Sequence, residues 1–233
     1  MRLIKQISSI FLLLGILTLN AQGDTIALMD VTASTGFAET YSINGTDVGN
    51  DQELFSQQII DDNFSVNANF IGSTDNAFLG GGFQIANSSA GQIDFTLEFL
   101  LPVAELDVTL NDWAGSLTIA LTGFDASIQS LLNEPIWAAA ANGQLMGTMF
   151  ADPFEMAVSG SGTDSISEAI DGSTPFAGDG MLAVRYAFSL SAGDSVVFGG
   201  SLGYVPAPGA IALLGLASMM GPRRRRSCPN RTN

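Results

Sequence analysis

Apolar and polar residues alternate strictly along several segments between residues 24 and 204. Residues 93–99, 105–110, 116–121 and 182–190 place apolar side chains at every second position. This period of two is typical of strands that bury one face and expose the other, so we predict strands in these four segments. Weaker alternation predicts further strands near residues 25–31, 37–43, 64–71, 78–86 and 154–159, and a last strand that ends at Tyr204.

Glycine-rich sites interrupt this alternation at three places. The turn at residues 192–194 precedes the strand that ends at Tyr204, and this order predicts a β-hairpin with the 182–190 strand. The glycine pair 199–200 predicts a bulge or a close approach of two backbones. The glycine triplet 80–82 lacks the Lys-Ser/Thr of a phosphate-binding loop, so it predicts a turn or a bulge.

Two segments lack the alternation. Residues 127–141 are rich in Leu, Ala, Gln and Ile, which predicts one or two short helices interrupted at Pro135. Residues 51–60 predict another turn of helix. About nine or ten short strands separated by turn residues favour an all-β fold, a two-sheet β-sandwich of jelly-roll or immunoglobulin-like type with one or two short helices.

Composition agrees with a single folded domain. The chain has 233 residues, of which 46% are hydrophobic, 13% are charged and 26 are glycine. A domain of this size buries enough surface for a substantial core. The only cysteine is Cys228, beyond the last apolar run, so we expect the fold to rest on that core without a disulfide.

Charge divides the chain into an acidic middle and basic ends. All 23 acidic residues lie between residues 24 and 194, and Arg185 is the only basic residue in that interval. Arg2 and Lys5 precede the first apolar run, and an arginine cluster at 223–226 follows the last. An acidic surface repels phosphate backbones, so nucleic acid is excluded as a partner class.

The first 23 residues predict a secretory signal for the general secretion machinery. A basic start precedes an apolar stretch at residues 7–19 and a small-residue exit, so we expect cleavage after Ala21 or Gly23. The alternative is an uncleaved anchor. At about 1.5 Å per residue, however, the apolar stretch is well short of a hydrocarbon core about 30 Å thick.

The C-terminal segment at residues 205–226 combines a proline pair, an apolar run at 209–221 and four arginines. Because basic residues stay on the cytoplasmic side, this order places the acidic domain outside the cytoplasm. The run spans roughly 20 Å as a helix, which suits a transient membrane stop better than a permanent span. A plain single-span anchor and a buried terminal helix are the alternatives.

This order resembles a PEP-CTERM sorting signal. The resemblance implies recognition by an exosortase-like membrane protease, which cuts near the motif and passes the protein to the cell envelope or the extracellular matrix. Ala207 stands where the family motif has glutamate, and residues 227–233 trail the arginines. Carried over by residue, the motif falls on Pro206, Ala207 and Pro208, the apolar helix on residues 209–221, and the basic stop on Arg223, Arg224, Arg225 and Arg226. The expected organisation is therefore a signal at 1–23, an acidic domain at 24–204, a sorting tail at 205–226 and trailing residues at 227–233.

The residues that follow the predicted signal lack the side chains that most enzyme mechanisms require. It has no histidine and no lysine after Lys5, which excludes histidine-based triads, histidine-bearing zinc sites and Schiff-base lysines. A carboxylate pair remains open, as in glycoside hydrolysis. Glu105 and Asp107 share a strand face, as do Asp94 and Glu98. In a chain with 23 acidic residues, however, such pairs arise by chance. We therefore expect solvated sheet faces and no catalytic residue.

Calcium is the only cofactor for which the sequence offers a candidate site. Asp47 and Asp51 lie in one dense cluster of oxygen donors, and Asp61 and Asp62 lie in another. Neither cluster matches the twelve-residue calcium loop, so ordinary polar turns are the alternative.

The two tryptophans leave a choice between ligand contact and packing. Trp113 and Trp137 could stack on sugar rings, but we expect them to pack inside the fold.

The first functional hypothesis is a non-enzymatic bacterial surface protein of structural or interaction type. It would be anchored in the envelope or released to the matrix after a membrane-inserted stage. The alternative is a carbohydrate-binding module, with or without calcium, whose partner is extracellular polysaccharide. The third hypothesis is a secreted hydrolase that uses carboxylates.

Overall fold

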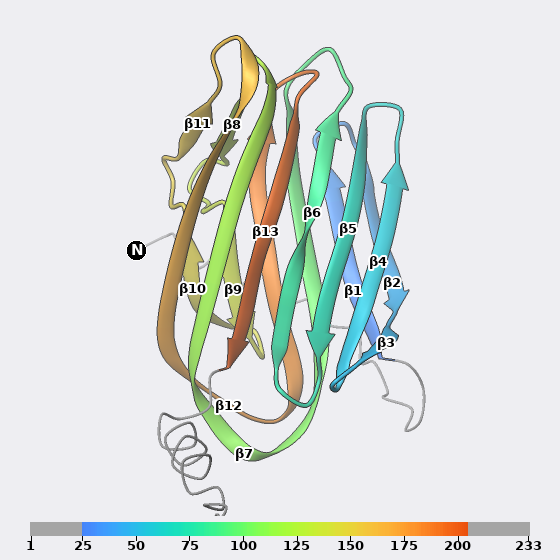
Figure 1. Ribbon diagram of the computed structural model, residues 1–233, viewed down its shortest axis with the longest axis vertical. Helices are drawn as coiled ribbons and strands as arrows, with labels where there is room; N and C mark the ends of the chain where they lie inside the picture. The colour runs from blue at the N-terminus through green and yellow to red at the C-terminus, as the bar shows by residue number, and fades with distance from the viewer. Residues whose placement is uncertain (1–24, 205–233) are drawn as a thin grey trace, which may run out of the picture.

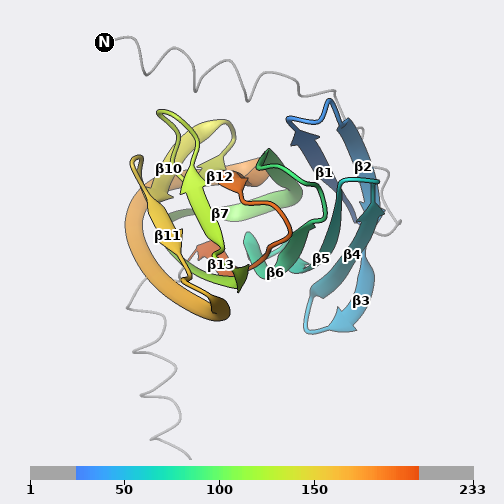
Figure 2. The same cartoon turned by 90° about the horizontal axis from the view of Figure 1, so that it is seen from above.

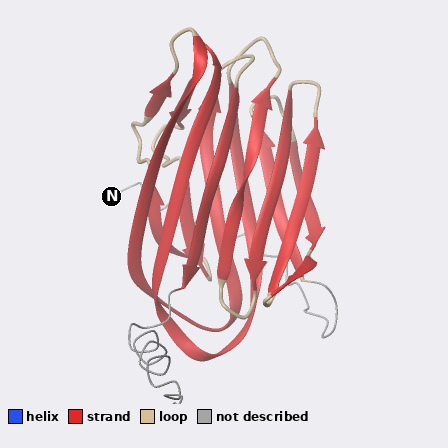
Figure 3. Ribbon diagram, in the orientation of Figure 1, coloured by secondary structure: helices blue, strands red, loops and turns tan. Residues whose placement is uncertain are grey.

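The computed structural model describes residues 25–204, so the predicted signal and sorting tail lie outside it. Within that range the side chains of residues 104–111 and 176–179 are not described. The described residues form thirteen strands, joined by turns and loops without a helix (Figure 3). They accordingly contain no helix with the length and apolarity to cross a membrane. The all-β prediction is confirmed, and the strands form two antiparallel layers.

Two long strands hold the layers together. β7 (Ile93–Phe124) and β12 (Ser161–Leu190) pair antiparallel from one end to the other. The ribbon that they form bends over at the bottom of Figure 1, where the register shifts between Ser173 and Gly180. Each half of the ribbon therefore belongs to a different layer, and the two layers are continuous through it.

The first layer has the strand order β2-β1-β7-β12-β9-β10 and contains the first half of β7 and the second half of β12. β8 pairs with the end of β12 and also with β11. The further bounds are β1 (Ile26–Ala33), β2 (Ala38–Asn44), β8 (Ser127–Ser130), β9 (Trp137–Ala141), β10 (Gln144–Met149) and β11 (Glu155–Ala157).

The second layer has the order β12-β7-β13-β6-β5-β4-β3 and contains the other halves of the two long strands. Figure 2 shows both layers along the strands, with the folded ribbon at one side and β2, β3 and β4 at the other. The bounds are β3 (Thr46–Gly49), β4 (Gln52–Ile60), β5 (Phe64–Ser73), β6 (Phe78–Asn87) and β13 (Ser195–Tyr204).

Aromatic side chains from both layers meet in the core. Phe83 of β6 stacks on Phe198 of β13 at a centroid distance of 4.8 Å. The same ring meets Tyr186 of β12 edge-on at 4.7 Å. Such pairs contribute about 0.5–1.5 kcal/mol beyond their buried area. Trp113 and Trp137 are also buried, which confirms the prediction that both pack inside the fold.

Two segments for which the sequence predicts helices form strands. Residues 127–141 divide into β8, a turn and β9, because β9 pairs with β12 and buries Ala139 and Ala141. Pairing and burial here outweigh the helix propensity of alanine. Residues 52–60 form β4, in which Phe55 and Ile59 are buried. A spacing of four residues fits a helix and a strand equally well.

The predicted hairpin between the last two strands is wrong. β12 ends in the first layer, whereas β13 lies between β6 and β7 in the second. The turn at residues 191–194 therefore crosses between layers. Buried Asp194 holds it in place, since its Oδ1 accepts a hydrogen bond from the Phe124 N–H at 3.2 Å.

The glycine runs meet in the middle of the second layer. Gly199 pairs with Gly82 and Gly200 with Gly81, without a register shift, so the predicted turn or bulge at residues 80–82 is wrong. A Cβ atom on Gly82 would lie 2.0 Å from the carbonyl oxygen of Phe198. The close backbone approach predicted for residues 199–200 is confirmed, because a Cβ atom on Gly200 would lie 2.3 Å from the Ser116 oxygen.

Candidate functional site

Three charged side chains lie side by side on the outer face of the first layer. Asp30 on β1 is opposite Glu98 on β7, and Glu98 is opposite Arg185 on β12. Their neighbours Val31, Leu97 and Val184 are buried, so alternation directs the charged residues away from the core. Directly opposed residues have Cβ atoms about 4.5–5.5 Å apart, which places the three head groups within reach of one another.

These residues line an open cleft of about 420 Å³, here called the charged cleft. Threonine hydroxyls from β1, β2 and β7 continue its polar surface beside the carboxylates. In the next row of the sheet, Thr32 is opposite Ala38 on one side and Thr96 on the other. The complete lining is Asp30, Thr32, Ala38, Glu39, Thr40, Thr96, Glu98 and Arg185.

Arg185 is the only basic residue in the part of the chain that the structure describes. Its Nη2 atom forms an ion pair with Glu134 Oε2 at 2.8 Å, and its side chain is 13% exposed. Glu134 precedes β9, so the ion pair joins that turn to the face of the sheet. One guanidinium therefore balances carboxylates on both of its sides.

Glu98 has an unusual protonation behaviour. Only 8% of the residue is exposed, and burial raises the pKa of its carboxyl from 4.5 to about 7. The neighbouring Asp30 charge raises this pKa further, whereas Arg185 lowers it. The charge of the cleft consequently changes near neutral pH.

Two polar atoms in the charged cleft have no hydrogen-bond partner among the described residues. They are Asp30 Oδ1, an acceptor, and Arg185 Nε, a donor, and both are buried. An unpaired buried polar group costs about 1–3 kcal/mol. A hydroxyl group both donates and accepts hydrogen bonds, so hydroxyls placed in the cleft would satisfy both atoms.

The two candidate calcium clusters lie at opposite ends of β4. Asp47 and Asp51 lie near the start of β4, and Asp61 and Asp62 follow its end, about 30 Å away at roughly 3.3 Å per residue. Asp47 Oδ1 accepts a hydrogen bond from Gly49 N–H at 2.7 Å, and Asp61 Oδ1 accepts one from Asn63 N–H at 2.9 Å. Among the side chains that the structure describes, no three acidic groups cluster as a metal site would require.

The other candidate residues have varied placements. Asp94 shares the outer face with Glu98, but its Oδ1 accepts a hydrogen bond from Ser189 Oγ at 2.5 Å. Glu105 and Asp107 belong to the stretch whose side chains are not described. The remaining candidates also lie outside the described residues: Ala21 and Gly23 of the signal, and Pro206, Ala207, Pro208 and Arg223 to Arg226 of the tail.

Sequence reasoning missed the partners of Glu98. It paired this residue with Asp94 along the same strand, whereas the structure pairs it with Asp30 and Arg185 on neighbouring strands. One signal was present in the sequence, because Arg185 is the single base of an acidic domain and lies in a strictly alternating segment.

No protein-family model matches the chain, and no curated protein matches it. Several solved structures are similar to it at low identity, and three of them follow. The structure of TmCBM61 in complex with β-1,4-galactotriose is 13% identical, with a TM-score of 0.28, over 53% of this chain and 71% of that one. The enzymatically active domain of bacteriophage CBA120 tailspike protein 4 is 14% identical, with a TM-score of 0.23, over 67% of this chain and 20% of that one. The adhesin domain of Epf from Streptococcus pyogenes is 11% identical, with a TM-score of 0.24, over 76% of this chain and 57% of that one.

Proposed function

We propose that the domain at residues 25–204 is a carbohydrate-binding module and that the charged cleft is its binding site. The observation that carries this proposal is an unpaired acceptor on Asp30 and an unpaired donor on Arg185, which lie on either side of Glu98 in the same cleft. Sugar hydroxyls both donate and accept hydrogen bonds, so the hydroxyls of one glycan supply a donor for Asp30 and an acceptor for Arg185. The threonine hydroxyls along the cleft extend the same hydrogen-bonding chemistry.

The charge of the cleft supports a preference for neutral sugars. Asp30, Glu39 and Glu98 line it, and Arg185 is already paired with Glu134. A uronic acid would bring a further carboxylate into this site, and like charges in such contacts are unfavourable. A neutral polysaccharide meets no such repulsion.

The proposed setting is the outside of a bacterial cell. The signal-like start, the acidic middle and the PEP-CTERM-like tail support export, passage through a membrane-inserted stage and sorting by an exosortase-like protease. The folded β7–β12 ribbon supports a sandwich of jelly-roll type. We further propose that the module binds its ligand without hydrolysing it.

A glycan-array measurement on protein purified from native cells tests the binding site. Asp30→Asn should weaken binding to the retained neutral glycans about tenfold, because it replaces one carboxylate oxygen with an NH2 donor and leaves only a neutral, weaker acceptor. The matched variant Asp62→Asn removes an exposed carboxylate outside the cleft and should bind like the wild type. Equal binding by all three proteins, or binding to no glycan, would overturn the assignment.

Mass spectrometry of the same protein tests the sorting proposal separately. A C-terminus between Pro206 and Gly209 is expected after processing. Recovery of an intact tail that includes Arg223 to Arg226 would contradict cleavage.

A further inference from the structure

Two neighbouring carboxylates in the charged cleft lack a partner. Glu98 is only 8% exposed and lines the cleft, yet it forms no hydrogen bond or close ion pair with any described residue. Asp30 lies directly opposite it on β1, and the buried Oδ1 atom of Asp30 is unpartnered as well. Buried charges in proteins are normally paired, so these two side chains leave acceptors that a cation would satisfy.

The only cation of the cleft is already paired. Arg185 Nη2 contacts Glu134 Oε2 at 2.8 Å, and Glu134 is not part of the cleft lining. The lining also contains Glu39, whose Oε2 accepts a hydrogen bond from the Tyr41 hydroxyl. Three carboxylates therefore line the cleft with one guanidinium, which is shared with a fourth carboxylate. A positive charge on the ligand meets net attraction here.

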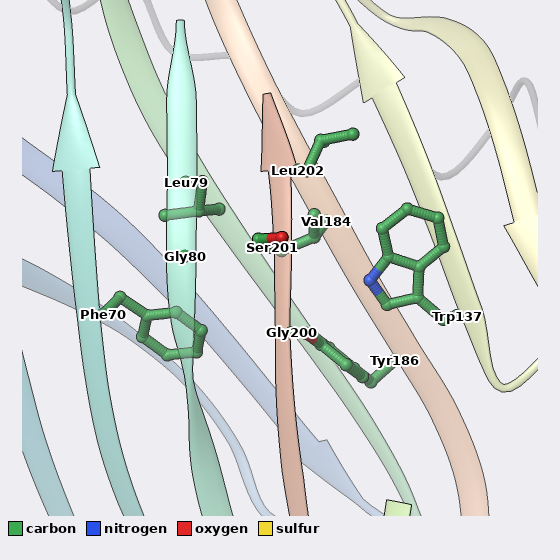
Figure 4. Close-up of a pocket in the computed structure, with 9 residues that line it drawn as sticks. All are labelled: Phe70, Leu79, Gly80, Trp137, Val184, Tyr186, Gly200, Ser201 and Leu202. Carbon is green, nitrogen blue, oxygen red and sulfur yellow. The ribbon is translucent and has the colours of Figure 1, made fainter. Parts of the chain in front are cut away.

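The interior of the sandwich provides no other place for a sugar. Figure 4 shows Phe70, Trp137 and Tyr186 among the side chains that fill the space between the layers. The cavity that they line measures only about 10 Å³, which holds at most one water molecule. A ligand must therefore be bound on an outer face, where the charged cleft lies.

The two carboxylates suit an ammonium group better than a metal ion. Ca²⁺ takes about six to eight oxygen ligands, and the described side chains include no group of three acids that could hold a metal. An ammonium group donates only three hydrogen bonds. Asp30 and Glu98 accept two of them, and the hydroxyl of Thr40, which is opposite Asp30 on β2, can accept the third.

The same cleft also needs an acceptor from its ligand, because the buried Nε atom of Arg185 has no partner. A lysine side chain carries three donors and no acceptor, so it would satisfy the carboxylates and leave Arg185 unpaired. A sugar with a free amine carries an ammonium group together with hydroxyl groups. The unpaired atoms of the cleft, taken together, therefore match an amino sugar.

We propose that the charged cleft recognises a glycan through a free, protonated amino sugar, whose ammonium group lies between Asp30 and Glu98 and whose hydroxyls reach Arg185. This contact presupposes the proposed function and names the sugar class that the same site selects. The other units of the polysaccharide can be neutral. Charge-assisted hydrogen bonds are roughly twice as strong as neutral ones, so the amine should raise the affinity about tenfold.

The protonation of Glu98 makes this contact dependent on pH. Burial and the Asp30 charge raise the pKa of Glu98 to about 7, and a bound ammonium group would lower it again, because it favours the ionised form. By linkage, the affinity for the amine is low where Glu98 is protonated and rises as the pH approaches and passes 7, until the sugar amine loses its own proton. The other charged groups around Glu98 are Asp30 on β1, Glu39 on β2, Arg185 on β12, Glu134 beyond Arg185, and Asp94 on β7 itself.

Isothermal titration calorimetry on the full-length protein purified from native cells tests this contact with three β-1,4-linked trisaccharides. The probes are cellotriose, fully N-acetylated chitotriose, and the same chitotriose with one acetamide replaced by a free amine. A single charge per probe keeps non-specific attraction to the acidic surface small. At pH 7 and physiological salt, the probe with the amine should bind about tenfold more tightly than the other two.

Two variants assign the preference to the cleft. Glu98→Gln has nearly the same shape but no charge, so it should bind all three probes with similar affinity. Asp62→Asn removes an exposed carboxylate outside the cleft and should keep the preference of the wild type. In the wild type, the affinity for the amine should rise between about pH 5.5 and pH 7, and Glu98→Gln should not show this rise.

Several outcomes would overturn the amino-sugar contact. Equal binding of the three probes, or a preference that Glu98→Gln retains, would refute the contact and leave carbohydrate binding in place. A preference that Asp62→Asn loses as fully as Glu98→Gln would identify attraction by the acidic surface as a whole. If none of the probes binds, the contact is refuted, and a glycan array without any signal would remove the proposed function with it.

Discussion

Replacing Glu98 with glutamine should stabilise the protein at neutral and alkaline pH. Burial and the Asp30 charge raise the pKa of the Glu98 carboxyl from 4.5 to about 7, so the folded state opposes ionisation of this group. Below pH 4.5 the carboxyl is protonated in both the folded and the unfolded state, and no penalty arises. Between pH 4.5 and 7 the unfolded state alone ionises, and the wild type loses stability as the pH rises.

The size of the effect follows from this difference in pKa. At about 1.36 kcal/mol per unit, the penalty reaches roughly 3 kcal/mol above pH 7. Glu98→Gln cannot ionise and has nearly the same shape, so it escapes the penalty. For a domain of this size the corresponding rise in Tm is about 6–12 °C at pH 8.

Thermal and urea denaturation of wild type and Glu98→Gln, from pH 4 to pH 8, measures the effect. The difference in unfolding free energy should be small at pH 4, grow through pH 5 to 7 and level off above. Asp62→Asn, which also neutralises a carboxylate but an exposed one, should follow the wild type at each pH. A difference for Glu98→Gln that does not vary with pH would refute the reasoning.

Three further results are expected. Arg185→Gln should lower the unfolding free energy by roughly 3 kcal/mol in urea denaturation, because it leaves Glu98 and Glu134 without their cation. A loss much below 1 kcal/mol would contradict the role of Arg185 as their partner. Gly82→Ala should lower the unfolding free energy by about 1–3 kcal/mol, because its Cβ atom would lie 2.0 Å from a backbone oxygen. Gly199→Ala should be neutral or slightly stabilising, because its Cβ atom would meet no atom within 4 Å. Equal Tm values for the two variants would show that the close approach at Gly82 is absent. Calcium should leave the Tm unchanged in scanning calorimetry, because Asp47 and Asp61 accept hydrogen bonds within their own turns; a concentration-dependent rise would restore the calcium hypothesis.

Local alternation was enough to predict much of the fold. Residues 93–99 alternate because β7 has one face in the core, and the same holds for residues 182–190 of β12. Alternation did not reveal that residues 93–124 form a single strand, because the bend of the ribbon is produced by pairing with β12. It also failed for Trp137–Ala141, where small residues with high helix propensity become a strand only through contact with β12.

The candidate site was much harder to predict. Asp30, Glu98 and Arg185 come from three strands, and their alignment depends on the register between strands far apart in sequence. No local pattern specifies that register. The pairing of the two glycine runs was equally hidden, because a single sequence does not indicate that β6 and β13 are neighbours.

The position of β13 has a mechanical consequence. This strand is hydrogen-bonded to β6 on one side and to β7 on the other, in both cases from Ser195 onwards. A pulling force applied through the chain that follows Tyr204 acts along the strand axis, so it loads both ladders together and cannot open them one bond at a time. A surface protein tethered at that point would resist shear flow through a strand that is paired on both sides along its length.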